Sequence, residues 1–460
     1  MQKTQTAVAQ PDDAGLTLVP LRDEDTIGRS ALRKASVRLL PLIGLGYGIA
    51  FTDRVNISFA ALQMNRDLHF SATVFGLGAG LFFVSYAACE VPSNLLLVRF
   101  GARRWLARIM LTWGLLAMSM MLVRTAREFY VMRLLLGAAE AGYFPGVMFY
   151  LMQWFPAGER AKAVSRWYIA FPLASAAMGA AAGALLHLDG RWHLTGWQWL
   201  LLAEGLPAVL MSVVFLVALP DGPADARWLT DAERAWIEQR MRAERESRPE
   251  GHEKGDLARA FGDARVWLLG AFFFCGLLAS YGYTFSAPAL VQQVTGWGAT
   301  AVGWTIALLG LLGASAMWAN GWHSDHTRER RGHILVPLLL VTAGFATAGL
   351  SVSPVVVLPA LALIFAGYAA VQGPVWTIPP EFLQGRSAAA GIATINTIGI
   401  LGGFVGPACV GLLKDWTGSY QKGMLAMAAP ALGAALLVLL AFRVHSRDVV
   451  AASRQAGLVR

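Results

Sequence analysis

The sequence places an acid, a base and an amide inside one apolar stretch, Tyr47-Gly48-Ile49-Ala50-Phe51-Thr52-Asp53-Arg54-Val55-Asn56-Ile57-Ser58. An ionised side chain at the centre of a membrane-spanning helix costs about 3 kcal/mol even on a lenient insertion scale. A partner of opposite charge must offset that cost, and the next charged pair inside an apolar run is Arg133 and Glu140. We interpret these four charged residues as the working centre and the rest of the chain as the scaffold that holds them.

The composition around this stretch is that of an all-α polytopic membrane protein. Of 460 residues, 56% are hydrophobic and 15% are charged, whereas a soluble domain carries about 25% charged residues. The net charge of +9 does not indicate nucleic-acid binding, because Lys and Arg fall in short loops. Cys89, Cys275 and Cys409 lie in apolar runs without CxxC spacing, so we expect neither disulfides nor a metal site, and no cofactor. Residues 1–36 lack the apolar core of a signal peptide and are predicted to form a disordered cytoplasmic tail.

Twelve apolar runs are long enough to span a membrane, which takes about 20 residues each. They are 37–60, 73–98, 104–123, 128–152, 162–187, 198–219, 266–288, 300–321, 333–352, 354–377, 388–413 and 421–443. An even number of spans places both termini on one side of the membrane. Lys and Arg concentrate in the loops after spans two, four and eight, so the positive-inside rule predicts that both termini are cytoplasmic.

One long polar segment, 220–263, separates six spans from six. Thr230 and Glu233 within it have the spacing of a capping box, and the apolar residues that follow fall on one helical face. We predict a short amphipathic helix that lies on the membrane surface or on the helix ends beneath it. The predicted organisation is an N-terminal tail (1–36), a six-helix half (37–219), this central loop (220–263), a second six-helix half (264–443) and a cytoplasmic C-terminal tail (444–460).

The two halves share a repeated loop. Asn94-Leu95-Leu96-Leu97-Val98-Arg99-Phe100-Gly101-Ala102-Arg103-Arg104 follows span two, and Gly321-Trp322-His323-Ser324-Asp325-His326-Thr327-Arg328-Glu329-Arg330-Arg331 follows span eight. Both occupy the same place in their half and both end in Arg-Arg. A repeat of six-helix halves is typical of transporters, whose substrate site lies between the halves near the middle of the membrane.

This loop resembles the G-x-x-x-D-R-x-G-R-R motif of the major facilitator superfamily. The second copy keeps the Gly and the Asp as Gly321 and Asp325, whereas the first has Asn94 and Val98 in their places. In the family the Asp helps to latch the cytoplasmic side, so the resemblance implies such a latch only for the second half. It implies gating roles for the loop residues Asn94, Asp325 and Arg328.

Four further stretches are similar to the anion:cation symporter family within that superfamily. They are Asp53-Arg54-Val55-Asn56, Glu90-Val91-Pro92-Ser93-Asn94, Gly137-Ala138-Ala139-Glu140-Ala141-Gly142-Tyr143-Phe144-Pro145-Gly146 and Glu204-Gly205-Leu206-Pro207-Ala208. The last, with Trp197-Gln198-Trp199 before it, resembles the bacterial tartrate and phthalate permease branch. The resemblance covers roughly residues 37–445. It implies the major facilitator fold, with twelve transmembrane helices in two halves.

The depths of the charged residues follow from helix geometry. Asp53 is fifteen residues from Arg38 at the cytoplasmic end, which is about 22 Å along a helix. It therefore lies about 8 Å inside the outer edge of a core about 30 Å thick. Arg133 is five residues from Glu128 at the outer edge, again about 8 Å. We therefore expect an ion pair between Asp53 and Arg133, with Glu140 two turns further on the same face.

These residue types suit proton-coupled transport of an anion. A carboxyl that alternates between pairing with a base and accepting a proton can couple a pH gradient to a conformational change. Arg is always charged and binds a carboxylate with two hydrogen bonds. The resemblance implies that Arg54 and Arg133 bind the anion and that Asp53 and Glu140 carry protons. The alternative is a purely structural ion-pair network.

Other candidates surround this centre. Glu90 lies near the cytoplasmic end of its span, which favours a gate over substrate binding. The resemblance implies substrate contacts for Tyr86, Trp376 and Asn396, although core packing is the alternative for the two aromatic residues. Phe51 stands where many relatives have a Tyr, and the missing hydroxyl argues against a heavily hydroxylated substrate.

The sequence therefore predicts a monomeric inner-membrane importer of a small organic carboxylate, coupled to protons and working by alternating access. A drug:proton antiporter is an alternative, but its G-P-x-x-G-G pattern is absent from residues 174–180. A membrane sensor of the same anion is a second alternative, and neither tail is long enough for a signalling domain. An enzyme would need a clustered nucleophile, base or metal set, and the sequence has no such motif.

Overall fold

A computed structural model describes residues 21–168, 170–246, 262–327, 329–375 and 385–455. Within these ranges the chain is helical, with short 3-10 turns and no β-strand. The first half comprises α1 (Leu21–Asp67), α2 (Ala72–Phe100), α3 (Ala102–Ser119), α4 (Ala126–Glu140), α5 (Tyr143–Trp154), α6 (Ala157–Tyr168), α7 (Ala170–Leu186) and α8 (Gly196–Ala218). After α9 (Asp231–Glu246), the second half comprises α11 (Ala264–Thr295), α12 (Ala299–Thr327), α13 (Arg331–Leu350), α14 (Pro354–Val375), α16 (Gly385–Thr417) and α17 (Tyr420–Gln455).

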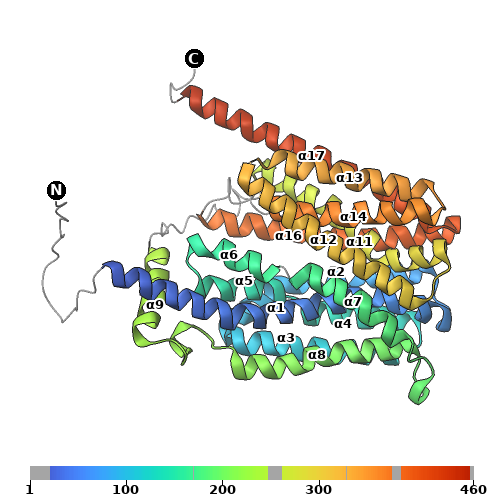
Figure 1. Cartoon of the computed structure of the whole chain (residues 1–460), viewed down its shortest axis with the longest axis horizontal. Coiled ribbons are helices and arrows are strands. Elements are labelled where there is room, and N and C mark those ends of the chain that lie inside the picture. Colours follow the sequence, from blue (N-terminus) through green and yellow to red (C-terminus); the bar gives the residue numbers. More distant parts are fainter. Residues whose placement is uncertain (1–20, 169, 247–261, 328, 376–384, 456–460) are drawn as a thin grey trace, which may run out of the picture.

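The helices run side by side along the longest axis, with α1–α8 on one side of the bundle and α11–α17 on the other (Figure 1). The first residues of α1 and the last residues of α17 lie at the same end of the bundle, and α9 lies at this end too, beside α1. We call this the terminal end of the bundle and the opposite one the far end. The even number of crossings that the sequence predicts accounts for this arrangement.

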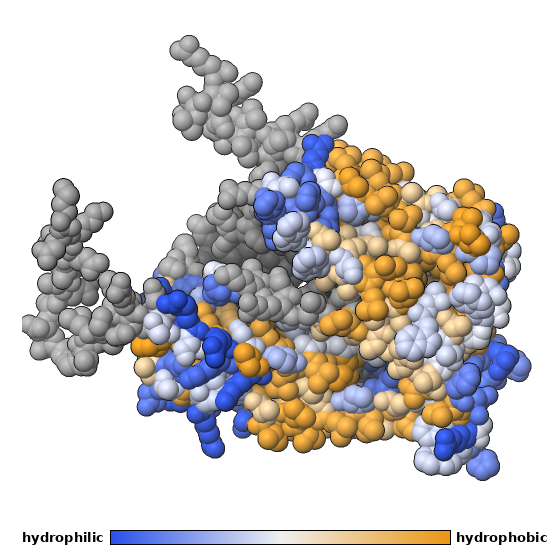
Figure 2. All heavy atoms as spheres, in the orientation of Figure 1, coloured by the Kyte–Doolittle hydropathy of each residue, from blue (hydrophilic) through white to orange (hydrophobic). Residues whose placement is uncertain are grey.

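Eleven helical segments of the described chain, with α4 and α5 counted together, are long and apolar enough to cross a membrane. The remaining predicted span, 162–187, corresponds to α6 and α7, which meet at residue 169, outside the described residues. Apolar side chains cover the middle of the bundle, and hydrophilic ones gather at its two ends (Figure 2). Val217 and Val355, each 82% exposed, belong to a long series of exposed large apolar side chains, which together form a surface suited to lipid rather than to water. The chain is a multi-pass membrane protein of the all-α class.

The most extensive contacts between the halves are made by two helix pairs, α2 with α16 and α7 with α12. Glycines make both contacts possible. A side chain at Gly76 of α2 would collide with the Pro407 carbonyl of α16, and one at Gly303 of α12 would collide with the Gly179 carbonyl of α7. Small residues of this kind let helix backbones approach closely in a membrane, where packing rather than hydrophobicity holds helices together.

The N-terminal part of α1 corrects one sequence-based expectation. The helix begins at Leu21, so residues 21–36 are not the disordered tail that their polarity predicts. Ala31 and Ala35 are completely buried. Ser30 Oγ and Lys34 Nζ donate to the two oxygens of the Glu233 carboxylate at 2.7 and 2.8 Å. The segment is ordered by its contact with α9, a partner about 200 residues away that local periodicity cannot reveal.

The predicted amphipathic helix is α9, and it packs on the terminal part of α1. The capping box is present, since the Thr230 backbone N–H donates to Glu233 Oε2 at 2.9 Å and the Glu233 N–H donates to Thr230 Oγ1 at 3.3 Å. Burial opposes the charge of Glu233, but hydrogen bonds from Lys34, Ser30 and Thr230 outweigh it and lower the pKa of Glu233 to about 2. One carboxylate therefore both begins α9 and attaches it to α1.

Replacing Glu233 by Gln should loosen α9, because Gln keeps the shape but loses the ion pair with Lys34. The loss is about 1 kcal/mol, since Lys34 is partly exposed. Amide hydrogen exchange of α9 at pH 7 should show several-fold lower protection in the variant. A depressed pKa stabilises the folded form above the unfolded value and loses that contribution as pH falls. The difference from wild type should therefore be full above about pH 5 and shrink towards pH 2. Equal protection at pH 7 would contradict this role.

Candidate functional site

A cavity of about 190 Å³ lies between the two halves of the bundle. Apolar and aromatic side chains make up much of its wall, and a small set of polar groups converges on it. Those polar groups are Tyr47, Arg54, Ser58, Tyr86, Glu140, Tyr143, Ser175, Ser280, Tyr281, Tyr283, Thr284, Tyr368, Gln372 and Asn396. A mostly apolar cavity with a few convergent polar groups is typical of a small-molecule site.

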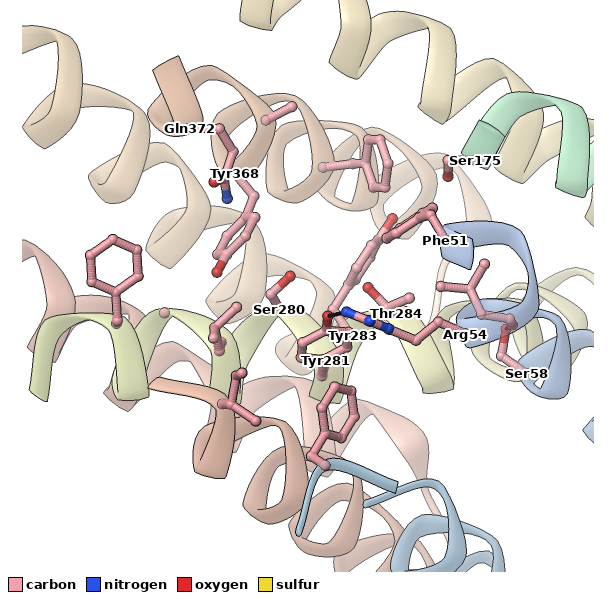
Figure 3. Close-up of a pocket in the computed structure, with 18 of the residues that line it drawn as sticks. Phe51, Arg54, Ser58, Ser175, Ser280, Tyr281, Tyr283, Thr284, Tyr368 and Gln372 are labelled. Carbon is pink, nitrogen blue, oxygen red and sulfur yellow. Dashed lines mark hydrogen bonds between the residues drawn. The ribbon is translucent and has the colours of Figure 1, made fainter. Parts of the chain in front are cut away.

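Arg54 is the only described arginine or lysine that lines this cavity. It projects from α1 towards Tyr281 of α11, next to Ser280 and Thr284 (Figure 3). Its Nη1 donates to the Tyr281 hydroxyl at 3.3 Å, and its Nη2 forms a short ion pair with Glu140 Oε1. The guanidinium also lies 5.3 Å from the ring centre of Tyr86. Arg54 thus connects the two halves while 20% of its side chain stays exposed to the cavity.

Glu140 is positioned by a break in the fourth span. The predicted helix 128–152 is two helices, because α4 ends at Glu140 and α5 begins at Tyr143. Between them Gly142 has φ +88°, which only glycine adopts without strain. A Cβ at Gly142 would also collide with Ser93 Oγ of α2. The break leaves Glu140 almost fully buried at the cavity wall, 1% exposed, directly against Arg54. Discontinuous helices of this kind form substrate and ion sites in many transporters.

Asp53 faces away from the cavity, as its position next to Arg54 on a helix requires, because neighbouring residues are rotated by about 100°. It is 2% exposed. Trp113 Nε1 of α3 donates to its Oδ2 at 2.6 Å, and Asn56 Nδ2 donates to its Oδ1 at 3.3 Å. Asp53 is therefore a buried, hydrogen-bonded carboxyl behind the cavity rather than in its wall.

Arg133 does not form the expected ion pair with Asp53, and it does not line the cavity. Its side chain is completely buried. Nε and Nη2 donate to the backbone carbonyls of Gly78 and Ala79 in α2, each at 3.2 Å. Helix geometry predicts that Asp53 and Arg133 lie at the same depth in the membrane. The two residues do lie close enough for their opposite charges to attract each other. The acceptors that Arg133 uses are backbone atoms of another helix, which residue types in a sequence do not reveal.

The remaining predicted residues are distributed as follows. Tyr86 and Asn396 line the cavity. Asn396 Nδ2 of α16 donates to Glu90 Oε1 of α2 at 2.9 Å, so these two residues link the halves. Asn94 lies beside the α4–α5 break, close to Gly142.

Asp325, in the last turn of α12, forms an ion pair at 2.7 Å with Arg330, which directly precedes α13. The family resemblance implies gating roles for both Asp325 and Arg328. Arg328 and Trp376 lie outside the described residues.

The sequence reasoning missed the polar groups of the second half. Tyr281 holds Arg54, and Tyr368 and Gln372 point into the same cavity from α14 (Figure 3). One signal could have revealed part of this set. The run Ser280-Tyr281-Gly282-Tyr283-Thr284 concentrates hydroxyls in the middle of an otherwise apolar span. Tyr368 and Gln372 are single polar residues one turn apart, and core packing explains such residues equally well from sequence alone.

Comparisons with known proteins agree with this architecture. The family model of the Major Facilitator Superfamily matches residues 43–407. A protein of Agrobacterium vitis named "Putative tartrate transporter" is 45% identical over 420 residues, which cover 91% of this chain and 92% of that protein. A "Quinolone resistance transporter" of Acinetobacter baumannii is 37% identical over 396 residues, covering 86% and 91%.

A solved structure has the same fold. It is a bacterial homolog of the human lysosomal transporter Spinster in an inward-facing, unoccupied conformation, with a TM-score of 0.73. It is 17% identical in sequence, and the match covers 90% of this chain and 98% of that one. The helical bundle in two halves, the cavity between them and the family match over most of the chain lead to one conclusion. The chain belongs to the Major Facilitator Superfamily of membrane transporters.

Proposed function

We propose that this transporter imports a small organic carboxylate together with protons, across the cell inner membrane and with both termini in the cytoplasm. The observation that carries the proposal is the placement of Arg54. It is a forked, permanently charged group in the cavity wall, and its charge is balanced by an acid that can be protonated, Glu140. When Glu140 is protonated, a substrate carboxylate can take its place as the negatively charged partner of Arg54.

The proposed coupling is an exchange of partners. When Glu140 is ionised, it occupies Arg54 and competes with an anionic substrate. When Glu140 accepts a proton it becomes neutral, and the guanidinium is free to bind a carboxylate with two parallel hydrogen bonds. Loading one substrate carboxylate thus takes up one proton, and the total charge of the cavity stays unchanged. An unpaired charge in this apolar setting is costly. Binding of the anion without the proton, or of the proton without the anion, is therefore disfavoured.

The size and chemistry of the cavity favour a small anion. Cavities that hold drug-sized ligands measure about 300–1,000 Å³, whereas this one measures about 190 Å³. The hydroxyls of Tyr281, Ser280 and Thr284 lie next to Arg54 and would bind further oxygen atoms of the substrate. The relative named as a tartrate transporter supports an anion of that type.

A second candidate is export of a drug in exchange for protons, which the 37% identical quinolone resistance relative supports. In this case the substrate moves out of the cell while protons move in, whereas in the proposed symport both move in. A drug:proton antiporter would expel a quinolone from vesicles under the same inward proton gradient, because protons enter as the drug leaves. It would not accumulate a labelled carboxylate.

The test is uptake by proteoliposomes of labelled tartrate-like, aromatic and sugar acids, with and without an inward proton gradient. We expect accumulation of one of these classes only with the gradient, and a protonophore should abolish it. Full accumulation without a gradient would contradict proton coupling. Proton-dependent efflux of a quinolone without carboxylate uptake would favour the exporter.

Alternating access requires contacts that close one end of the bundle and can be released. At the far end, Asp415 of α16 accepts hydrogen bonds from the Ala72 and Thr73 backbone N–H groups of α2, at 3.0 and 2.8 Å. A carboxylate at a helix N-terminus is favoured by the unpaired N–H groups and by the helix dipole. On the other seam, Thr300 Oγ1 of α12 donates to the Gly183 carbonyl of α7 at 3.3 Å. We interpret both contacts as latches that hold the far end closed.

Asp415→Ala should open the far end more often. Loss of two charge-assisted hydrogen bonds at an exposed site costs about 1.4 kcal/mol, which is about tenfold in the population of the open state. A cysteine introduced at Thr284, in a background without the native cysteines, should then react faster with a membrane-impermeant thiol reagent added from the far side. Asp67→Ala is the matched control, because Asp67 lies at the same end but contacts only its own half, through Trp197 Nε1. Equal acceleration in both variants would contradict the latch.

A further inference from the structure

Glu204 of α8 is a buried carboxyl that the exchange between Arg54 and Glu140 does not involve. It is 8% exposed, and neither of its oxygens meets a donor at hydrogen-bonding geometry among the described residues. It does not line the central cavity. It lines a separate groove between α1, α7 and α8, whose wall includes Gly48, Thr52 and Ala174. The rim of the groove carries lipid-facing residues such as Leu45, which is 59% exposed.

The inner wall of this groove adjoins Asp53. Thr52, which lines the groove, directly precedes Asp53 on α1. Asp53 and Asn56 are the polar neighbours that act on the Glu204 carboxyl. Asn56 in turn donates to Asp53 at 3.3 Å. Asp53, Asn56 and Glu204 therefore form one polar cluster within the first half, on the side of α1 that faces away from the cavity.

The charges of the neighbouring residues determine whether Glu204 is protonated. Arg54 is neutralised by Glu140, and Arg133 is the cation that acts on Asp53. Among the residues that the structure describes, no further cation acts on Glu204. The described part of α7, Ala170–Leu186, has no ionisable side chain. On α3 the residues that pack against the adjacent Gly205 are Gly114 and Met118.

An ionised carboxylate without a cationic partner in such surroundings is strongly disfavoured, and the group takes up a proton instead. The groove wall also contains a backbone carbonyl without its helical donor. Pro207 has no N–H, so the Ala203 carbonyl one turn earlier lacks its helical donor. Ala203 and Pro207 both line the groove with Glu204. A protonated carboxyl can donate a hydrogen bond to a free carbonyl, whereas a carboxylate can only accept.

We propose that Glu204 is a third proton-binding carboxyl of the transport cycle, which holds a proton in this conformation and releases it in another. The proton is carried as the carboxylic acid of Glu204, and it leaves to Asp53 or to water when the packing of α1 on α8 changes. The groove between α1, α7 and α8 places this site on the side of α1 that faces away from the central cavity. The role in transport rests on the proposed proton coupling, but the protonation of Glu204 does not.

The experiment has two readouts on the full-length protein. The first is the infrared carbonyl band of protonated carboxylic acids at neutral pH. Wild type should show a band that Glu204→Gln removes and Glu204→Asp shifts. Glu128→Gln, which changes an exposed carboxyl, should remove no such band. Gln has the shape and the charge of the protonated acid, so this variant should fold, and Glu204→Asp provides a second, independent test.

The second readout is the number of protons taken up per substrate molecule, measured in proteoliposomes with a pH-sensitive dye. Glu204→Gln should keep substrate binding and take up fewer protons per substrate than wild type. A band that persists in Glu204→Gln would overturn the proposal, and so would loss of the band with an unchanged proton count. Failure of the proposed function looks different. In that case wild type itself would take up no protons with substrate.

Discussion

Arg54→Lys is expected to lose most of the binding of the carboxylate substrate, although the positive charge is kept. Arg54 presents two N–H groups of one planar fork, one towards Glu140 and one towards Tyr281 of the other half. Lys has a single ammonium group and cannot reproduce this geometry. A hydrogen bond to a charged group contributes about 1.5–3 kcal/mol, so the dissociation constant should rise by about 10- to 100-fold. Calorimetric titration with the transported acid measures this directly.

Arg133→Lys is the matched comparison, because the sequence suggested the same role for both arginines. Arg133 is completely buried and donates to the carbonyls of Gly78 and Ala79. Its replacement should lower the thermal stability, whereas the protein that remains folded should bind substrate with an affinity close to that of wild type. Wild-type affinity in Arg54→Lys, or lost binding with full stability in Arg133→Lys, would contradict this assignment.

Glu140→Gln should abolish proton-driven accumulation and keep substrate binding. Gln mimics the protonated acid, so Arg54 stays free for the substrate and no proton needs to be taken up. Uptake against a concentration gradient should fall to the level of empty vesicles, whereas exchange of internal for external substrate should continue. The buried guanidinium loses its partner, which typically destabilises by about 3–5 kcal/mol, and less here because Arg54 is partly exposed to the cavity.

Loss of the ion pair between Arg54 and residue 140 also provides an internal check on the Glu140→Gln variant. A bound carboxylate would supply the missing negative charge, so substrate should raise the melting temperature more in the variant than in wild type. Glu128→Gln serves as the control, because Glu128 lies on the same helix but is exposed at the far end. Glu140→Gln that still accumulates substrate against a gradient would leave Asp53 or Glu204 as the coupling acid.

The features that the sequence predicts correctly are those determined by composition and periodicity. Apolar length gives the spans, and the four quoted motifs give the superfamily. The rarity of charge in lipid singles out Arg54 and Glu140 together with Asp53 and Arg133, and the roles of all four stay predictions. Arg54 and Glu140 do lie in contact at the cavity. The helix within the central loop was predictable because its capping box is local.

The features that it does not predict depend on contacts between distant segments. Arg133 bonds to backbone carbonyls of α2, and a carbonyl carries no sequence signal. The order of residues 21–36 depends on Glu233 of α9. The α4–α5 break needs Gly142, but glycine is common in membrane helices, and only the approach of Ser93 shows why this one is required. The direction of Asp53, towards Trp113 rather than Arg133, follows from packing around α1.

The central claim is that binding of the carboxylate and protonation of Glu140 are one event. It is tested most directly by the protons taken up when the transported acid binds to purified protein, measured by calorimetry in buffers with different ionisation enthalpies. Wild type should take up protons on binding, and its affinity should fall as pH rises. In Glu140→Gln proton uptake should decrease, and the affinity should depend less on pH. Binding to wild type without proton uptake, at an affinity independent of pH, would contradict the exchange of partners at Arg54.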